Sequence, residues 1–279
     1  MSSNDTTGKT LLVATLLCVF CSIFVSYAAV ALKPEQEANK QLDKSKSILA
    51  AAGLLKTAPD SNVSSARDIT ALFNQRIDVK VVNLHTGEYL TEANASTEWE
   101  KAIVKDPQDY DQRKAAKTQG QNEILDAATD IAVIKRQPKY ATVYLAKNEA
   151  GQVESIILPV NGYGLWSTLY GFLALKTDTT TVVGLGFYEH GETPGLGGEV
   201  DNPKWKSVWP NKQAFDESGK VAIHLIKGTV DSGNSQASHQ IDGLAGATLT
   251  SRGVTNLVQY WLGDNGFGPY LAKVKQQGV

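Results

Sequence analysis

Residues 11–32, LLVATLLCVFCSIFVSYAAVAL, carry no charged side chain. A run of this length is long enough to cross the hydrocarbon core of a bilayer as one helix. A secretory signal peptide is the alternative, because Ala29-Val30-Ala31 resembles an Ala-x-Ala cleavage site. However, the run is too long for the apolar region of a signal peptide, and the tail before it holds only Lys9 and Asp5. We therefore predict a retained transmembrane helix followed by a soluble region.

The side of the membrane on which the soluble region lies does not follow from charge alone. Lys33, Lys40, Lys44 and Lys46 follow the apolar run, and a simple count of positive charges would place the soluble region in the cytoplasm. Large domains are translocated largely regardless of such a count. The residues themselves therefore leave the orientation open.

The composition excludes two classes of function. The net charge at pH 7 is −2, so the chain lacks the positive field that nucleic-acid-binding domains use. Cys18 and Cys21 are the only cysteines and both lie in the apolar run, so the soluble region has no disulfide framework and no thiolate metal site. We interpret the pair as small apolar residues in lipid or at a helix interface, with a redox or ligand pair as the alternative.

The apolar patterns predict an α+β fold for the soluble region, with a mostly antiparallel, twisted sheet flanked by helices. Helices are predicted over 35–55, 65–77, 124–135 and 251–266. Strands are predicted over 78–84, 140–147, 152–160, 171–178, 180–190 and 221–228. Short connections between most of these strands favour antiparallel pairing. Residues 86–120 show no clear pattern.

Residues 242–250, DGLAGATLT, place small residues and hydroxyls directly before the last predicted helix. Thr248, Thr250 and Ser251 lie near its N-terminus, where one of them is expected to serve as the N-cap. A helix N-terminus also offers free N–H groups and the positive end of the helix dipole to a phosphate. One hydroxyl can cap the helix while another is modified.

Two other segments also have compositions that suit the surroundings of a ligand. Residues 189–198, EHGETPGLGG, contain four glycines, which allow close approach of the backbone to a flat ligand. Residues 162–171, GYGLWSTLYG, combine aromatic rings with hydroxyls, although these rings would also suit a core. Together with residues 242–250, these segments predict the surroundings of a flat, phosphorylated cofactor.

The sequence Asp242-x-x-Ala245-Gly246-Ala247-Thr248 resembles the flavinylation motif of FMN-binding domains. In that family the last hydroxyl is joined to FMN through a phosphoester, and a separate Mg²⁺-dependent transferase makes the bond from FAD. Ala245 departs from the pattern, because Ser or Thr is common there. The resemblance implies one covalent FMN on Thr248, and a role for Asp242 in transferase recognition or in hydrogen bonds within the loop.

Segments over nearly the whole chain resemble the C-type subunit of the Na⁺-translocating NADH:quinone reductase, among them LDKSKSILAAAGLL, GLWSTLYGFLAL, EHGETPGLG, NPKW and DGLAGATLTSRGV. The G-type subunit of the Rnf complex shares ETPGLG, GAT and a single span, and is an alternative. The long region 35–139 and the GLWS sequence favour the quinone reductase. A membrane-anchored extracytoplasmic binding module without a redox role is the alternative from a different class.

The resemblance implies a single-pass protein of the bacterial inner membrane with its soluble domain on the periplasmic side. Its partners would be the other subunits of a six-subunit pump, and the FMN transferase during maturation. Its FMN would relay electrons from an iron–sulfur cluster held between two membrane subunits to a second covalent FMN, carried by the B-type subunit. The expected boundaries are 1–10 for a cytoplasmic tail, 11–32 for the span, 33–138 for the first soluble part, 139–270 for the FMN-binding domain and 271–279 for a C-terminal tail.

The predicted site holds a cofactor and has no catalytic residue or metal ligand of its own. Thr248 is expected to carry the flavin, Gly246 and Ala247 to leave room for its phosphate, and Leu249 and Thr250 to line the phosphate. The residues predicted around the ring are Trp166, Ser167, Thr193, Gly195 and Leu196. The four histidines are scattered, and only His190 and His239 lie in or close to the segments 189–198 and 242–250.

Overall fold

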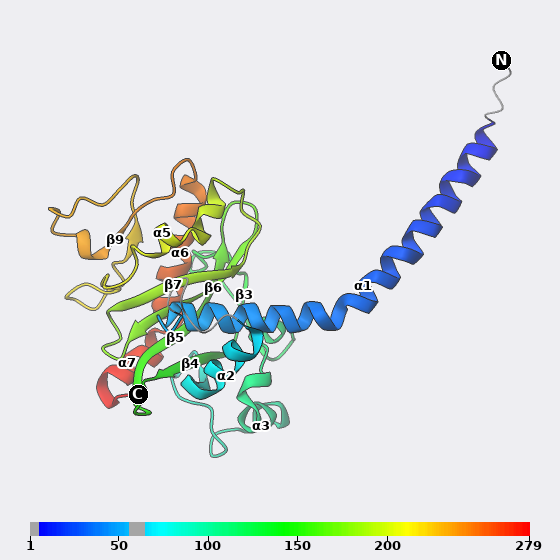
Figure 1. Cartoon of the computed structure of the whole chain (residues 1–279). Coiled ribbons are helices and arrows are strands. Elements are labelled where there is room, and N and C mark those ends of the chain that lie inside the picture. Colours follow the sequence, from blue (N-terminus) through cyan, green and yellow to red (C-terminus); the bar gives the residue numbers. More distant parts are fainter. Residues whose placement is uncertain (1–5, 56–64) are drawn as a thin grey trace. The chain divides into compact units, whose positions relative to one another are not determined.

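The computed structural model describes residues 6–55 and 65–279 (Figure 1). Helix α1 (Thr7–Ala51) contains the predicted span and the helix predicted to follow it as one continuous element. By length and composition it can cross a membrane, and the side chains of residues 11–32 are exposed. The chain divides into two compact units, one ending at Lys44 and one beginning at Ser45. The second unit contains the sheet and every loop considered below.

A five-stranded antiparallel sheet forms the centre of the second unit, as the α+β prediction required. Its strand order is β1-β4-β5-β6-β7. The strands are β1 (Ile77–Asn83), β4 (Tyr140–Lys147), β5 (Val153–Tyr163), β6 (Thr168–Lys176) and β7 (Val182–Glu189). Because β1 pairs with β4, the sheet crosses the expected boundary between residues 138 and 139.

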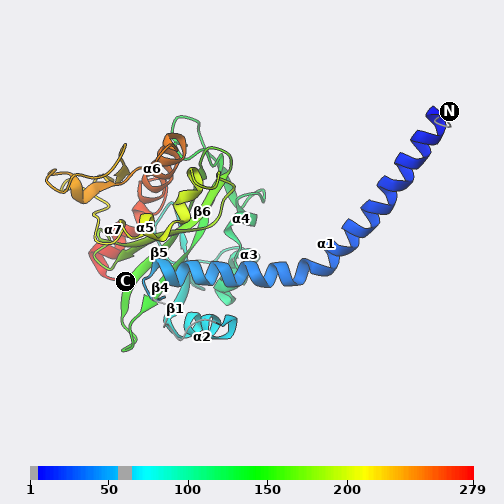
Figure 2. The same cartoon turned by 45° about the horizontal axis from the view of Figure 1, so that its top comes forward.

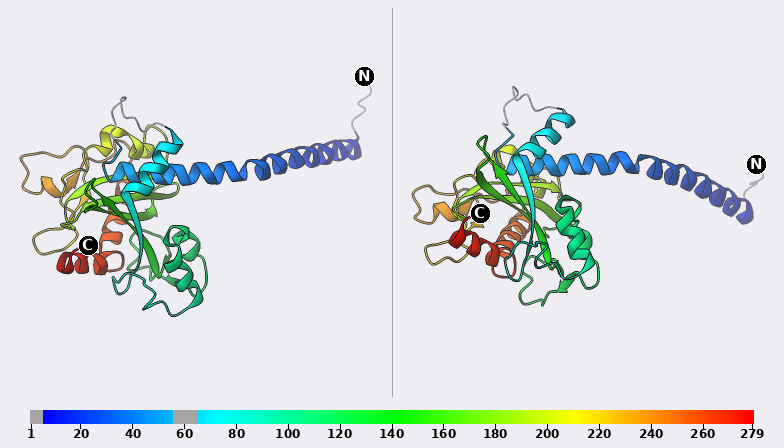
Figure 3. Two further views of the ribbon diagram at one scale, coloured as in Figure 1. Left: turned by 60° about the horizontal axis from the view of Figure 1, so that its bottom comes forward. Right: turned by 90° about the horizontal axis from the view of Figure 1, so that it is seen from below.

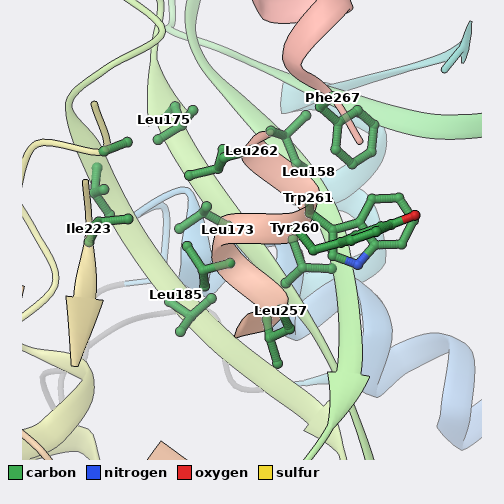
Figure 4. Close-up of a cluster of buried hydrophobic side chains, with 14 of the residues drawn as sticks. Leu158, Leu173, Leu175, Leu185, Ile223, Leu257, Tyr260, Trp261, Leu262 and Phe267 are labelled. Carbon is green, nitrogen blue, oxygen red and sulfur yellow. The ribbon is translucent and has the colours of Figure 1, made fainter. Parts of the chain in front are cut away.

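Helix α6 (Thr248–Leu262) covers one face of the sheet and contributes much of the core (Figure 4). Five apolar residues at helical spacing, the stripe of α6, are all buried: Val254, Leu257, Val258, Trp261 and Leu262. The helix lies very close to β5, because a Cβ added at Gly162 would be 2.5 Å from the Cβ of Leu257. The helix therefore holds a fixed position on the sheet from which its N-terminus projects.

The opposite face is covered by the last turns of α1 and by α2 (Ala66–Arg76) (Figure 2). A Cβ added at Gly184 in β7 would lie 2.8 Å from the carbonyl oxygen of Ala51. Phe73 of α2 contacts Tyr144 of β4 edge-to-face, with ring centres 6.4 Å apart. Ser65 caps α2 through a capping box with Asp68.

Short helices complete the second unit. Residues 86–120 form α3 (Glu98–Lys105), the 3₁₀ turn η1 (Pro107–Asp109) and α4 (Gln112–Ala115), beside the edge strand β1 (Figure 3). A small apolar cluster of Val81, Ile103 and Tyr140 anchors them there. The remaining helical elements are η2 (Gly197–Asp201), α5 (Pro203–Lys206), η3 (Ala237–His239) and α7 (Gly268–Gln277). Leu271 and Val274 of α7 are buried, so the expected C-terminal tail packs on the core.

The helix predicted over 124–135 is wrong. Ile124 ends β2 (Asn122–Ile124), and residues 125–135 form turns that lead to β3 (Arg136–Pro138). The side chain of Asp126 accepts the N–H of Ala128, and that of Asp130 accepts the N–H of Ile134 and of Lys135. Such local bonds compete with helical ones, and the hydrophobic spacing did not reveal them.

The strand predicted over 221–228 is much shorter than expected. Only β8 (His224–Leu225) forms, and it pairs in parallel with β9 (Gln240–Ile241), away from the main sheet. The strand that completes the five-stranded sheet is β1, near the start of the second unit.

Candidate functional site

Three segments singled out in the sequence meet at the carboxylate of Glu192: residues 162–171, 189–198 and 242–250. Glu192 is 5% exposed. Its Oε1 accepts the backbone N–H groups of Leu165, Trp166 and Ser167 at 3.1, 3.0 and 3.3 Å. Its Oε2 accepts the hydroxyl of Thr250, in the first turn of α6, at 2.7 Å. One side chain of the Gly-rich loop thus joins the turn before β6 to the start of α6.

The surroundings of Glu192 keep its side chain ionised. Burial raises the pKa of this carboxyl, but the hydrogen bonds from Thr250 and from the three backbone N–H groups outweigh burial, so its pKa lies below the ordinary value. The Gly-rich loop 189–198 approaches the start of α6 closely enough for these bonds only because residue 197 is glycine. A Cβ there would lie 2.5 Å from Thr250 Oγ1 and 2.7 Å from Glu192 Oε2.

The expectation that a hydroxyl caps α6 is wrong. The N-cap is Ala247, and no side chain among the described residues caps the helix. The Thr250 hydroxyl is turned inward to Glu192, and Ser251 Oγ accepts the N–H of Leu244 at 3.0 Å. Thr248 is exposed as the first residue of the helix. The N-terminus of α6 therefore presents uncapped N–H groups beside an accessible hydroxyl, an arrangement suited to a phosphate.

Exposed apolar side chains surround this helix end. Trp166 is 67% exposed, Leu249 46% and Leu196 44%. Gly246 has a φ of +71°, and a Cβ there would lie 3.1 Å from Leu196 Cδ2, so the Gly-rich loop and the segment before α6 are in contact. Gly195 has a φ of +75° and faces open space. This part of the surface combines an uncapped helix end, which suits a phosphate, with exposed apolar surface that suits a flat ring.

Comparison with known proteins identifies this region. Residues 164–263, which contain most of all three segments, match the family model of the FMN-binding domain. The C-type subunit of the Na⁺-translocating NADH-quinone reductase of Pseudomonas aeruginosa is 51% identical over 276 residues, 99% of each chain. The chain belongs to the family of these C-type subunits. Its counterpart from Vibrio vulnificus is 45% identical over the full length of both chains.

Two solved structures from this family share the fold. The NqrC structure from Shewanella oneidensis has a TM-score of 0.72 and 33% sequence identity, and covers 86% of this chain and 100% of its own. The C-type subunit from Parabacteroides distasonis has a TM-score of 0.59 and 26% identity, with coverages of 86% and 96%. The chain is thus a subunit of an electron-transferring oxidoreductase, and its cofactor is FMN.

The predicted cofactor residues fall into two groups in the structure. Exposed at the helix end and on the loops are Thr248, Leu249, Gly246, Trp166, Thr193, Gly195 and Leu196. Turned inward or held by internal bonds are Ala247, Thr250, Ser167 and Asp242. The first group supplies surface for a ligand, and the second shapes the loops that carry it.

Asp242 and Ser167 illustrate the second group. Asp242 Oδ1 accepts the N–H of Val230 at 2.8 Å, and its carbonyl accepts the indole N–H of Trp205 at 2.9 Å. Ser167 Oγ accepts the N–H of Gly191 at 2.6 Å. Asp242 therefore joins the start of its loop to the segments that carry Val230 and Trp205, while its role in transferase recognition stays a prediction.

Sequence reasoning missed Glu192 as a site residue. Its signal was present, because Glu192 is a carboxylate placed between Gly191 and the Thr-Pro-Gly sequence of this loop. The role of His190 was also not assigned: its Nε2 contacts Asp201 Oδ2 at 2.7 Å, and its Nδ1 accepts the N–H of Glu192 at 3.2 Å. His239 instead bonds the carbonyl of Gln213, away from Glu192.

Proposed function

We propose that this chain carries one FMN joined through its phosphate to the hydroxyl of Thr248. The observation that carries the proposal is the exposed Thr248 at the uncapped N-terminus of α6. A transferase supplies the flavin from FAD. The bond between Thr248 Oγ and phosphorus forms as the anhydride bond of FAD breaks, and AMP leaves with the hydroxyl proton taken up by base or solvent.

The residues around Thr248 fit the group that they would hold. The free N–H groups of the first turn of α6 would bind phosphate oxygens, and the positive φ of Gly246 allows the backbone to pass close to the ribityl chain. Trp166, Leu196 and Leu249 offer apolar surface to the ring. Bound FMN supplies reversible electron transfer, while the protein holds it in place and sets its electrostatic surroundings.

In the assembled reductase we infer a relay role for this flavin, on the periplasmic side of the bacterial inner membrane. Helix α1 anchors the chain, with residues 1–10 in the cytoplasm. Electrons arrive from an iron–sulfur cluster between membrane subunits and leave to the covalent FMN of the B-type subunit. A site on exposed loops supports this role, because electron transfer requires close approach of cofactors and no enclosed substrate pocket.

Thr248→Ala tests the attachment, in cells that also produce the transferase. This change should abolish flavin fluorescence of the denatured chain in a gel, and Thr248→Ser should retain it, because only the hydroxyl is needed. Thr193→Ala is the matched control, since it removes another exposed hydroxyl of the same site and should leave the fluorescence unchanged. A fluorescent Thr248→Ala band would place the attachment elsewhere, with Thr250 examined next.

A further inference from the structure

A cleft elsewhere on the molecule is lined by one residue of the three segments, Tyr170, and otherwise by residues outside them. Its volume is about 360 Å³, within the range of small-ligand sites. Its buried residue Trp261 lies about 20 Å along α6 from Thr248, at 1.5 Å per residue. None of its lining residues is a predicted flavin contact. The cleft is therefore a separate feature of the molecule.

Four side chains that line this cleft are cationic: Arg113, Lys117, Lys135 and Arg136. No Asp or Glu lines it in the part of the chain that the structure describes. Lys117, Lys135 and Arg136 are exposed, and none of the three forms an ion pair with any residue in 6–55 or 65–279. Three like charges around one hollow repel one another, and an anion bound between them relieves the repulsion.

Arg113 is fixed in place by its own partners. Its guanidinium donates to both carboxylate oxygens of Glu189, at 2.8 and 3.0 Å, and lies 3.6 Å from the centre of the Tyr170 ring. This side chain therefore forms a rigid wall of the cleft, with its charge offset by Glu189. The three other cations supply the positive charge that a ligand would meet.

The turn that carries Lys135 and leads into Arg136, at the start of β3, is also held by internal hydrogen bonds. Val133 and Lys135 have φ values of 55° and 64°, in the left-handed region that β-branched Val rarely adopts. The carboxylate of Asp130 stabilises this backbone by accepting the N–H of Ile134 at 2.9 Å and of Lys135 at 2.6 Å. A loop that is already ordered loses less conformational entropy when it binds a ligand.

We propose that this cleft binds a phosphate-bearing anion. A phosphate group brings negative charge and several acceptor oxygens, which suit the planar fork of Arg136 and the ammonium groups of Lys117 and Lys135. Apolar surface from Ile134 and Pro138 suits the organic part of a phosphate ester. The phosphate can come from a phospholipid headgroup or from a free phosphate compound, and the two sources are separable by experiment.

Binding of inorganic pyrophosphate to the full chain in neutral detergent tests the cleft by calorimetry. The triple variant Lys117→Gln, Lys135→Gln and Arg136→Gln should raise the dissociation constant at least tenfold. The matched control is Lys105→Gln, Lys204→Gln and Lys227→Gln, which removes three other exposed cations and should stay within twofold of the unaltered chain. Equal weakening in both triple variants would show general electrostatic attraction and overturn the proposal.

Labelling of Lys117 and Lys135 with an amine reagent, in nanodiscs, identifies the source of the phosphate. Protection in discs that contain phosphatidylglycerol, but not in discs of phosphatidylcholine alone, assigns the cleft to an anionic headgroup. Protection that requires added pyrophosphate in either disc assigns it to a free phosphate compound. Protection only after partner subunits are added, with no effect of lipid or pyrophosphate, would overturn the proposal in favour of an acidic protein segment.

Discussion

At the scale of single residues, Glu192 determines whether the flavin site exists as one unit. Glu192→Ala leaves three backbone N–H groups and the Thr250 hydroxyl without their acceptor. We expect a loss of about 3 kcal/mol in the free energy of unfolding, together with reduced flavin loading. Glu192→Gln should cost only about 1 kcal/mol, because its amide oxygen still accepts the three N–H groups and its NH₂ can donate to Thr250.

Urea unfolding of the full chain in detergent, at pH 7 and pH 3, checks this prediction. The folded pKa of Glu192 is depressed below its ordinary value of 4.5, so its contribution is complete above that pH and is lost as the pH falls through the folded pKa. The difference between the unaltered chain and Glu192→Gln should therefore shrink at pH 3. Equal stability of the Ala and Gln variants at pH 7 would show that the carboxylate does not join the segments.

Glu192 also shows that long-range contacts of a single residue cannot be predicted from the sequence alone. Glu192 is separated by 27 residues from Leu165 and by 58 from Thr250. No local pattern encodes such contacts, since they depend on how β6, β7 and α6 are placed. Thr248 was singled out because the motif that residues 242–248 resemble is a short contiguous stretch, and the structure leaves this residue exposed. That Thr250 and Ser251 turn inward was not predictable from it.

At the scale of elements, two glycines of the loop 189–198 have different reasons to be glycine. Gly197 makes room for the bond between Glu192 and Thr250, whereas Gly195 faces open space with a positive φ. Gly195→Leu should cost about 1 kcal/mol of stability from backbone strain. It should also change the visible absorption of the bound flavin, because the new side chain enters the space proposed for the ring.

Gly219→Leu is the matched control for this change. Gly219 has a φ of +81° and also has no neighbour within 4 Å of an added Cβ, but it lies in the turn between Asp216 and Lys220. It should lose similar stability and keep an unaltered flavin spectrum. Identical spectra for the two leucine variants would mean that the flavin does not approach Gly195.

Elements whose conformation is determined by packing were predicted correctly from the sequence. Segments whose backbone conformation is determined by local side-chain hydrogen bonds were not. The stripe of α6 and the hairpins of β4 to β7 were predicted correctly, because each buries an apolar face against the sheet. The helix expected over 124–135 failed where Asp126 and Asp130 bond nearby N–H groups. The strand expected over 221–228 failed because its neighbour, β9, pairs with only two residues.

At the scale of the whole molecule, we predict that the soluble domain lies in the periplasm. The charges around the span do not by themselves indicate this side. A fusion of alkaline phosphatase after Val279 should be active in cells, because that enzyme requires export and the soluble domain is expected in the periplasm. A fusion of green fluorescent protein at the same position, exported through the Sec pathway, should be dark. A bright fluorescent fusion with inactive phosphatase would place the domain in the cytoplasm.

The central claim about the whole molecule is that one FMN is covalently attached at Thr248. The most direct measurement is the intact mass of the full chain purified from cells that also produce the transferase, followed by peptide mapping. We expect a gain of one FMN less one water, carried by the peptide that contains Thr248. A chain of unmodified mass under these conditions would contradict covalent attachment.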